Sequence, residues 1–177
     1  MINLELNSLT DLKREGKSFY WASFFLPKNS KINAGKLYSI CRYFDDIADS
    51  SSEDQTNYLK NSIEEIKNNK SNKVNIFLQK NKINNSIFVD LIEGLILDQK
   101  IIRIQNKEEL INYSYHVAGT VGLMMSKIIG VKNKNAEKSA IDLGIGMQLT
   151  NIARDVYEDS KMKRIYIPAN WIPNISL

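Results

Sequence analysis

The spacing of apolar residues constrains the fold of this chain more than any other feature. Along most of the 177 residues they recur every three or four positions, as on one face of an α-helix. No stretch alternates with the period of two that is typical of a β-strand, and only three prolines and eight glycines are available for turns. We therefore expect one all-α domain over residues 1–177. The expected helices cover residues 9–25, 32–49, 53–69, 84–100, 107–129 and 135–160.

The second of these helices ends in a cluster of aspartates. Asp45 and Asp49 are four residues apart and so lie on one helix face, with Asp46 beside them. Carboxylates this close repel one another, and the helix dipole disfavours negative charge at this end. A bound cation would relieve both costs, and Mg²⁺ is suited because it binds carboxylate, water and phosphate oxygens. A solvated acidic helix end without a ligand is the other interpretation.

The last expected helix repeats this arrangement. Asn151, Asp155 and Asp159 follow one another at four-residue steps. Towards the N-terminus the same face becomes smaller and less polar, over an arc of roughly 100° in all. The residues that continue it are Gln148, Gly144 and Ala140. This gradient predicts a cavity with an apolar floor and a charged rim. If the two acidic helices run in the same direction, their aspartates meet at the rim and a hydrocarbon chain could extend between them.

Three arginines accompany the acidic segments: Arg42, Arg154 and Arg164. Carboxylates alone would repel a diphosphate, whereas guanidinium groups make paired contacts with phosphate oxygens. A phosphate-binding role is therefore one interpretation of these arginines. The other is that each arginine pairs with a neighbouring aspartate and only balances its charge.

The segment 113–125 has a helical pattern but contains Gly119 and Gly122. Each glycine costs a helix about 1 kcal/mol relative to alanine, so something must pass close to them. A neighbouring helix is favoured over a ligand. Tyr113, Val117 and Val121 share a face of this helix and could line the channel for a hydrocarbon tail.

The bulk composition argues against several functions. The net charge is +4, but the lysines are scattered among asparagines, so we expect no nucleic-acid partner. The single cysteine, Cys41, permits no intrachain disulfide, and the single histidine, His116, supports neither a histidine-rich metal site nor a nucleophilic triad. With no signal peptide and no membrane-spanning apolar run, we expect a cytoplasmic protein. Loose attachment to the inner face of the cell membrane stays open.

Together these segments resemble the squalene/phytoene synthase family. The likeness covers residues 18–20, 26–27, 41–49, 91–94, 113–123, 148–159 and 164–166, in the order and spacing of the family. It implies the helical bundle of isoprenoid synthases. It also implies an enzyme that joins two prenyl diphosphates head to head with Mg²⁺, for which Mn²⁺ could substitute.

The resemblance also implies roles for individual residues. The metal ligands would be Asp45, Asp49, Asn151, Asp155 and Asp159. The catalytic set would combine the four aspartates with Tyr113, which would lie near the reacting carbons. Phosphate contacts would come from Arg42, Arg154 and Arg164. The substrate pocket would be formed by Ser18, Phe19, Val117, Val121, Ala140, Gly144 and Gln148.

Three features depart from the family, one of which is Ser114 in place of a common cysteine. Glu15 stands where many members have a histidine. Members also continue well beyond the length of this chain, whose apolar segments 165–168 and 171–173 would have little to cover them. We therefore expect either a C-terminally truncated bundle or a tail that folds back, and we expect the chain alone to be inactive or poorly folded.

The expected product is phytoene, made from two molecules of geranylgeranyl diphosphate. The close alternative is squalene or presqualene diphosphate from farnesyl diphosphate, and only squalene would require NADPH. An alternative of another class is a non-catalytic helical assembly factor, although such relatives tend to lose the aspartates that this chain keeps. A class I terpene cyclase would share the first motif, but its second motif normally contains serine or threonine and glutamate.

Overall fold

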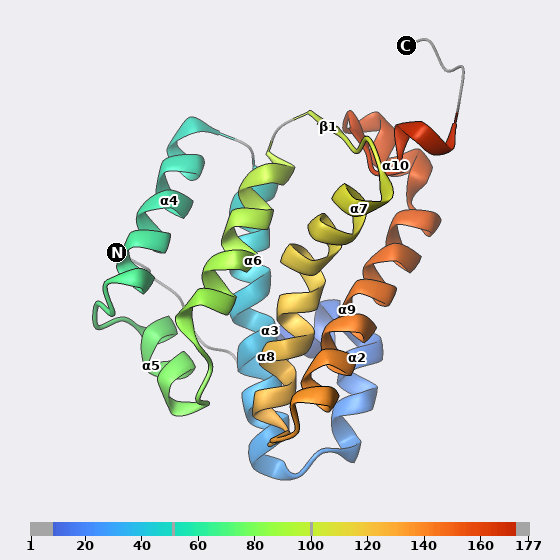
Figure 1. The fold of residues 1–177 in the computed structure, drawn as a ribbon. Helices are drawn as coiled ribbons and strands as arrows, with labels where there is room; N and C mark the ends of the chain where they lie inside the picture. Colours follow the sequence, from blue (N-terminus) through green and yellow to red (C-terminus); the bar gives the residue numbers. More distant parts are fainter. Residues whose placement is uncertain (1–8, 51, 100, 173–177) are drawn as a thin grey trace.

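The computed structural model describes residues 9–50, 52–99 and 101–172 and confirms the all-α fold. Helices α3, α6, α8 and α9 form the body of a bundle (Figure 1). The elements of the first half are α1 (Thr10–Glu15), α2 (Lys17–Ala22), η1 (Ser23–Phe25), α3 (Lys28–Asp49), α4 (Glu53–Lys67), α5 (Lys73–Lys80) and α6 (Asn85–Asp98). Those of the second half are β1 (Ile102–Arg103), α7 (Lys107–Ser114), η2 (Tyr115–Gly119), α8 (Thr120–Ile128), α9 (Lys134–Arg154), α10 (Val156–Lys161), β2 (Arg164–Ile165) and η3 (Ala169–Trp171).

The main hydrophobic core lies around α3, whose apolar residues follow the predicted helical repeat. Leu37, Ile40, Phe44 and Ala48 are buried, and α3 packs against α4, α6 and α8. Phe44 meets Phe88 of α6 edge to face, with ring centroids 5.3 Å apart. Burying an apolar side chain of this size contributes about 1.5–3 kcal/mol. The acidic C-terminal end of α3 is therefore carried by a helix that is firmly held in the core.

Side-chain caps start several helices. The capping box expected before α4 is present: Ser52 Oγ accepts from the Gln55 amide, and Gln55 Oε1 accepts from the Ser52 amide. Asparagine oxygens cap α5, α6, α7 and α9 by accepting from amides of the first turn. These residues are Asn72, Asn84, Asn106 and Asn133. Part of the asparagine excess of the sequence therefore has a structural role.

The structure divides three of the predicted helices and adds one. The helix expected over 9–25 breaks at Gly16, where a Cβ would lie 3.0 Å from the ring of Tyr38. The helix expected over 107–129 contains the π-helical turn η2, and the one over 135–160 is interrupted at Asp155. Helix α5 falls outside the predicted ranges, because two helical turns show little periodicity.

The glycines of α8, η2 and α9 lie where these helices touch. A Cβ on Gly122 would collide with the backbone oxygen of Ala140, and one on Gly144 would collide with the backbone oxygen of Ala118. A Cβ on Gly119 would lie 3.2 Å from the side chain of Ile141. The close neighbour that the glycines predicted is therefore a helix, α9, as favoured from the sequence.

The chain after α10 folds back across one end of the bundle. β2 pairs in parallel with β1, and the Ile104 amide donates a hydrogen bond of 3.1 Å to the Ile165 carbonyl. Tyr166 and Pro168 are buried by this return. Of the two outcomes expected for the apolar tail, folding back occurs for residues 164–172. Pro173 lies outside the described residues.

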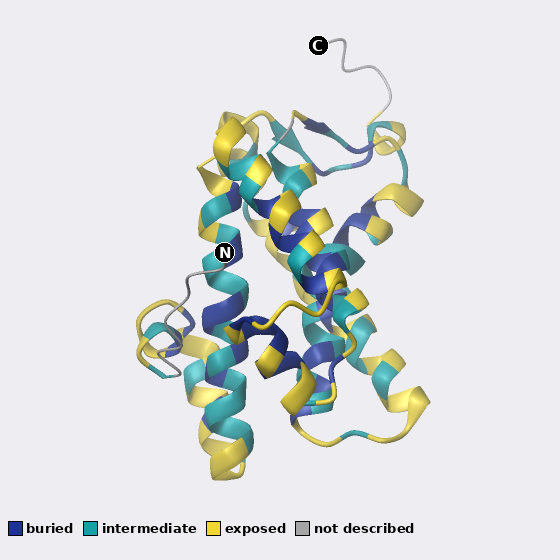
Figure 2. Ribbon diagram, turned by 90° about the vertical axis from the view of Figure 1, so that its left-hand side faces the viewer, coloured by how far each residue is buried: buried dark blue, intermediate teal, exposed yellow. Residues whose placement is uncertain are grey.

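Among the described residues, exposed apolar side chains gather on two pairs of neighbouring elements, whereas buried residues line the inside of the bundle (Figure 2). One surface covers α2 and η1 and contains Phe19, Trp21, Phe24 and Phe25. The other covers α9 and α10 and contains Leu143, Met147, Val156 and Tyr157. No helix within the described residues has the length and apolar character needed to span a membrane.

Candidate functional site

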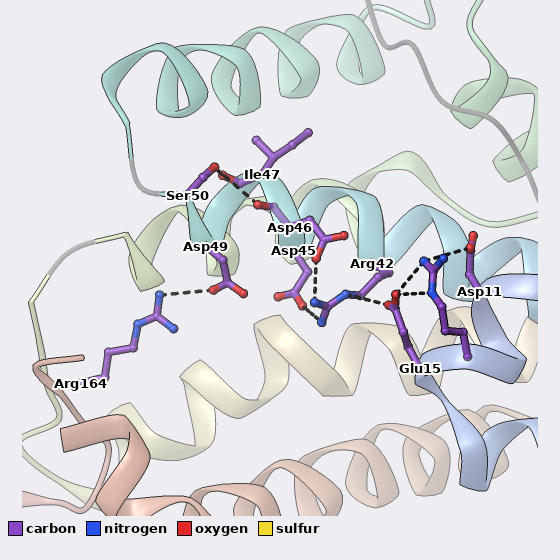
Figure 3. Close-up of polar contacts among 10 residues, drawn as sticks. Asp11, Glu15, Arg42, Asp45, Asp46, Ile47, Asp49, Ser50 and Arg164 are labelled. Carbon is purple, nitrogen blue, oxygen red and sulfur yellow. Dashed lines mark hydrogen bonds and ion pairs between the residues drawn. The ribbon is translucent and has the colours of Figure 1, made fainter. Parts of the chain in front are cut away.

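Arg42 joins three carboxylates at the first acidic motif, near the C-terminal end of α3 (Figure 3). Its guanidinium nitrogens lie 3.0 Å from Asp45 Oδ2, 2.7 Å from Asp46 Oδ1 and 3.2 Å from Glu15 Oε2. The structure therefore shows the charge-balancing pairs that were one of the two interpretations of this arginine. The Arg42 side chain is also 42% exposed, which leaves it accessible to a ligand.

The carboxyl group of Asp45 is electrostatically unfavourable as a charged group. Burial raises its pKa to about 6, the nearby charge of Asp49 adds to the effect, and Arg42 offsets only part of it. The side chains of Asp46 and Asp49 are more than half exposed. A cation in front of these oxygens would reduce the repulsion, and carboxylate oxygens are the kind of ligand that Mg²⁺ prefers.

The second acidic motif spans the junction between α9 and α10. α9 ends at Arg154 and α10 begins at Val156, so the prediction of one continuous helix is wrong at Asp155. The chain bends at Asp155, and α10 packs against β2, which follows it closely in the sequence. The Asp155 amide still donates to the Asn151 carbonyl, and the Asp159 amide to the Asp155 carbonyl, both at 2.9 Å. The helical hydrogen bonds between residues four apart in the motif are therefore kept across the bend.

Arg154 pairs with its direct neighbour in the second motif. Its Nε and NH2 atoms lie 2.6 Å from the two carboxylate oxygens of Asp155. These hydrogen bonds hold the pKa of Asp155 below its usual value. The Arg154 side chain is 68% exposed, so this arginine, like Arg42, balances an aspartate while staying open to solvent.

The two acidic motifs lie at the same end of the bundle. α3 and α9 run in the same direction (Figure 1), as the predicted meeting of their aspartates requires, and α8 packs against both. Arg164 of β2 is close to both motifs. Its NH2 group lies 3.5 Å from Asp49 Oδ1, and its charge partly offsets the rise in the pKa of Asp159 that burial and Asp155 cause.

The predicted metal ligands form two groups at this end of the bundle. Asp45 and Asp49 come from α3, and Asn151, Asp155 and Asp159 come from α9 and α10. Across the described parts of the chain, no three side chains of aspartate, glutamate, histidine or cysteine gather closely enough to hold a metal ion. Each group instead has an arginine as its partner.

The predicted pocket residues lie on α2, η2, α8 and α9. Ser18 and Phe19 of α2 are exposed. Val117 packs beside the cluster that contains Tyr113, and Val121 packs against the main core. On α9, Gly144 is buried against η2, whereas Ala140 and Gln148 are half-buried. The structure thus brings the η2, α8 and α9 residues onto adjoining helices and leaves those of α2 at the surface.

Two cavities of the described structure lie away from these residues. A cavity of about 660 Å³ is lined by the end of α4 and the start of α6, between Lys67 and Glu93. A second, of about 490 Å³, lies between α7 and Ile145 of α9. Neither contains a predicted site residue, so neither corresponds to the predicted channel.

Asp98 is a part-buried carboxylate that the sequence did not single out. It is the last residue of α6, and its oxygens accept hydrogen bonds from the Tyr113 hydroxyl at 2.9 Å and the Tyr166 hydroxyl at 2.8 Å. The two rings stack with centroids 4.8 Å apart. Burial raises the pKa of Asp98, which the two hydrogen bonds and Arg164 offset in part. The sequence signal that could have marked it is a lone charge after the apolar residues 94–97.

The sequence is similar to one protein family over nearly its whole length. The family model described as squalene/phytoene synthase matches residues 12–175. The chain belongs to this family. A phytoene synthase of Thermus thermophilus is 33% identical over 172 residues, covering 91% of this chain and 58% of that protein. A 15-cis-phytoene synthase of a Paracoccus species is 44% identical over 84 residues, covering 48% of this chain and 28% of that protein.

Solved structures share the fold of this squalene/phytoene synthase chain and confirm the predicted isoprenoid synthase bundle. A dehydrosqualene synthase solved in complex with a ligand has a TM-score of 0.82 at 29% identity, covering 92% of this chain and 60% of that one. Squalene synthase HpnC from Alicyclobacillus acidocaldarius has a TM-score of 0.78 at 20% identity, which shows the fold alone. The chain therefore spans about three-fifths of the length of these relatives.

Proposed function

We propose that this squalene/phytoene synthase chain carries the diphosphate-binding part of an enzyme that joins two prenyl diphosphates head to head. The proposal rests chiefly on one observation: both acidic motifs lie at one end of the bundle, with Arg164 close to each. The Thermus and Paracoccus relatives are named phytoene synthases. Their names favour phytoene, made from two molecules of geranylgeranyl diphosphate, as the product.

Mg²⁺ would be the metal of this site, and Mn²⁺ could replace it. Asp45 and Asp49 would hold it from one side, and Asn151, Asp155 and Asp159 from the other. All five offer the oxygen ligands that these cations prefer, and the two groups lie on helices that end at the same end of the bundle. When bound, the metal would neutralise the diphosphate and so make it a better leaving group.

The other site residues would bind and orient the substrates. Arg42, Arg154 and Arg164 would contact phosphate oxygens. For Arg42 and Arg154 this means exchanging an aspartate partner for a phosphate, which the exposure of their side chains permits. Tyr113, with its hydroxyl fixed by Asp98, would lie near the reacting carbons. The prenyl tails would contact Ser18, Phe19, Val117, Val121, Ala140, Gly144 and Gln148.

The proposed reaction begins when one substrate loses its diphosphate and becomes an allylic cation. The double bond of the second substrate attacks this cation, and loss of a proton closes a cyclopropane ring. The second diphosphate then leaves, the ring rearranges, and loss of another proton gives phytoene. The chain's own contribution would be to hold both diphosphates at the acidic end, with the tails directed along η2, α8 and α9.

A squalene-type product is the second candidate, because the dehydrosqualene synthase is similar over 92% of the chain. Squalene or presqualene diphosphate would be made from farnesyl diphosphate, and squalene alone would need NADPH to supply a hydride. A non-catalytic helical assembly factor is the alternative of another class. The presence of all four aspartates, Asp45, Asp49, Asp155 and Asp159, argues against it.

We also propose a cytoplasmic location with loose contact to the inner face of the cell membrane. The exposed Trp21, Phe24 and Phe25 of α2 and η1 support this contact, since aromatic side chains favour the membrane–water interface. Lys31, whose Nζ lies 3.6 Å from the centre of the Phe24 ring, adds a positive charge beside them. Flotation with anionic lipid vesicles tests the contact. A Trp21→Ser, Phe25→Ser variant that floats as well as the unchanged protein would refute it.

Product analysis tests the proposed reaction. A full-length version of the protein is incubated with Mg²⁺ and either the C15 or the C20 diphosphate, with and without NADPH. Phytoene from the C20 substrate is expected. Squalene from the C15 substrate would overturn the choice of product, and no turnover of either substrate would support the non-catalytic alternative. The 177-residue chain alone is expected to form little product, because Phe19 and the α9 surface around Leu143 are exposed.

A further inference from the structure

Asp98 joins three parts of the chain that are far apart in the sequence. It ends α6, Tyr113 belongs to α7, and Tyr166 follows β2. Tyr113 and Tyr166 lie 15 and 68 residues from Asp98, yet both hydroxyls donate to it, one to each carboxylate oxygen. Both tyrosine residues are only 6% exposed. The carboxylate is therefore the common partner of two buried donors.

The position of Asp98 is energetically unfavourable for a charged carboxylate. The C-terminal end of a helix disfavours negative charge, and burial removes hydrating water. Hydrogen bonds from two tyrosines and the nearby charge of Arg164 offset these costs. Without the carboxylate, both tyrosine hydroxyls would be left in a buried environment without this acceptor. The geometry thus makes Tyr113 and Tyr166 depend on the same side chain.

Tyr166 also links Asp98 to Arg164, which lies two residues before Tyr166 in the chain. The two residues belong to one short extended segment, in which Arg164 pairs with Ile102 of β1. Further along, the Ala169 amide donates to the Ile104 carbonyl at 3.0 Å, so Ile104, just after β1, is hydrogen-bonded to residues on both sides of Tyr166. The Arg164 side chain is only 14% exposed and reaches Asp49 at 3.5 Å. A shift of Tyr166 would therefore move this guanidinium relative to the acidic motifs.

We propose that Asp98 is a positioning residue that fixes both the Tyr113 hydroxyl and the Arg164 guanidinium at the acidic end of the bundle. It acts through Tyr113 and Tyr166 and does not itself contact substrate. This assignment rests on the proposed function. It predicts that Asp98 couples two kinds of effect, one on the chemical step through Tyr113 and one on diphosphate binding through Arg164.

Asp98→Asn in the full-length protein is the main test, because asparagine has the same shape but replaces one acceptor oxygen with a donor. We expect kcat/KM to fall by about 10- to 100-fold, the usual loss when a partner that orients site residues is changed. Both kcat and the affinity for inorganic pyrophosphate with Mg²⁺ should fall. Tyr166→Phe should weaken pyrophosphate binding more than it lowers kcat, since it leaves the contact with Tyr113 in place.

Asp90→Asn is the matched control. Asp90 lies on the same helix and accepts a hydrogen bond of 3.1 Å from the hydroxyl of Tyr115, but it has neither the second tyrosine nor the link to Arg164. It should leave kcat/KM and pyrophosphate affinity unchanged. Thermal melting of both variants shows whether lost activity reflects lost folding.

A double-mutant cycle completes the test. The effects of Asp98→Asn and Tyr166→Phe on pyrophosphate affinity should be clearly less than additive, because both remove one link. Additive effects would overturn the proposal, as would an Asp98→Asn protein that melts earlier yet keeps its kcat/KM and pyrophosphate affinity. Turnover by the unchanged protein tests the proposed function separately. If turnover is absent, that function fails, and pyrophosphate affinity alone then decides whether Asp98 positions Arg164.

Discussion

Helices α3 and α9 are of similar length and each leads to an acidic motif, yet they are packed in different ways. α3 has 22 residues, and its buried side chains contact α4, α6 and α8. α9 has 21 residues, of which only Gly144 and Ile152 are buried within the described structure. Its contacts are mainly with α8 and η2, and its outer side exposes Leu143 and Met147. One acidic motif is therefore carried by the core and the other by a helix packed on one side.

This difference has an electrostatic counterpart. Asp45 on α3 and Asp155 after α9 are both half-buried, but burial and the charge of Asp49 raise the pKa of Asp45, whereas hydrogen bonds from Arg154 lower the pKa of Asp155. A diphosphate site built from both motifs would combine a half carried by a core helix with a half carried by a helix packed on one side. Substitutions on the two helices should then affect stability and activity in different proportions.

The largest expected effect on stability separates the two helices directly. Phe44→Ala on α3 should lower the free energy of unfolding by about 3–5 kcal/mol, because it leaves a cavity beside Phe88. Leu143→Ala on α9, where the side chain is 67% exposed, should change it by less than about 0.5 kcal/mol. Urea denaturation followed by circular dichroism measures both. Equal losses would contradict the difference in packing.

For activity, the acidic motif after α9 should be as important as the one on α3. Asp155→Ala in the full-length protein should lower kcat by at least about 100-fold, because it removes charge that would help hold the metal. Asp142→Ala, an exposed aspartate earlier on α9, is the control and should leave kcat unchanged. Near-normal turnover of the Asp155→Ala protein would refute the metal role.

The two sides of α9 can be compared with two glycines. Gly144→Ala should destabilise the fold by about 1–3 kcal/mol, because its Cβ would collide with the backbone oxygen of Ala118. Gly146→Ala should stabilise it by about 0.5–1 kcal/mol, since nothing lies within 4 Å of that Cβ and alanine favours the helix. Thermal or urea unfolding of both variants checks the signs. A stabilising Gly144→Ala would show that η2 is not packed closely against α9.

The smallest expected effect concerns the pH dependence of stability. Because the pKa of Asp45 is raised to about 6, its protonated form is favoured in the fold, and this contribution is lost as pH rises from about 4 through about 6. Asp45→Asn should therefore be more stable than the unchanged protein at about pH 8 and equal to it at about pH 4. Partial exposure limits the gain to less than about 1 kcal/mol.

The opposite substitution on the second motif is the control for this titration. Asp155→Asn should not stabilise the protein at about pH 8, because Arg154 favours the charged form of Asp155. Unfolding curves at both pH values compare the two variants. The same gain for both would mean that the pKa values of the two aspartates are not shifted in opposite directions.

Much of the fold and part of the site were predictable because they depend on local spacing. The buried face of α3 and the capping box at Ser52 follow from residues within a few positions of one another, and Gly122 inside a helical pattern predicted a close neighbour. Asp98 was not predictable in the same way, because its partners Tyr113 and Tyr166 reach it only through tertiary packing. The bend at Asp155 was not predicted either, because the four-residue spacing of the motif continues through it.

The sequence by itself determined the helical class, the two acidic motifs and the family, because periods of three and four residues and the order of motifs are local properties. Only the tertiary structure decided that α3 and α9 run in the same direction, that Arg164 of the returning tail reaches Asp49, and that Asp98 holds two tyrosines. These features depend on which distant segments bury one another's surfaces. No local repeat encodes that choice, and it places both acidic motifs at the same end of the bundle.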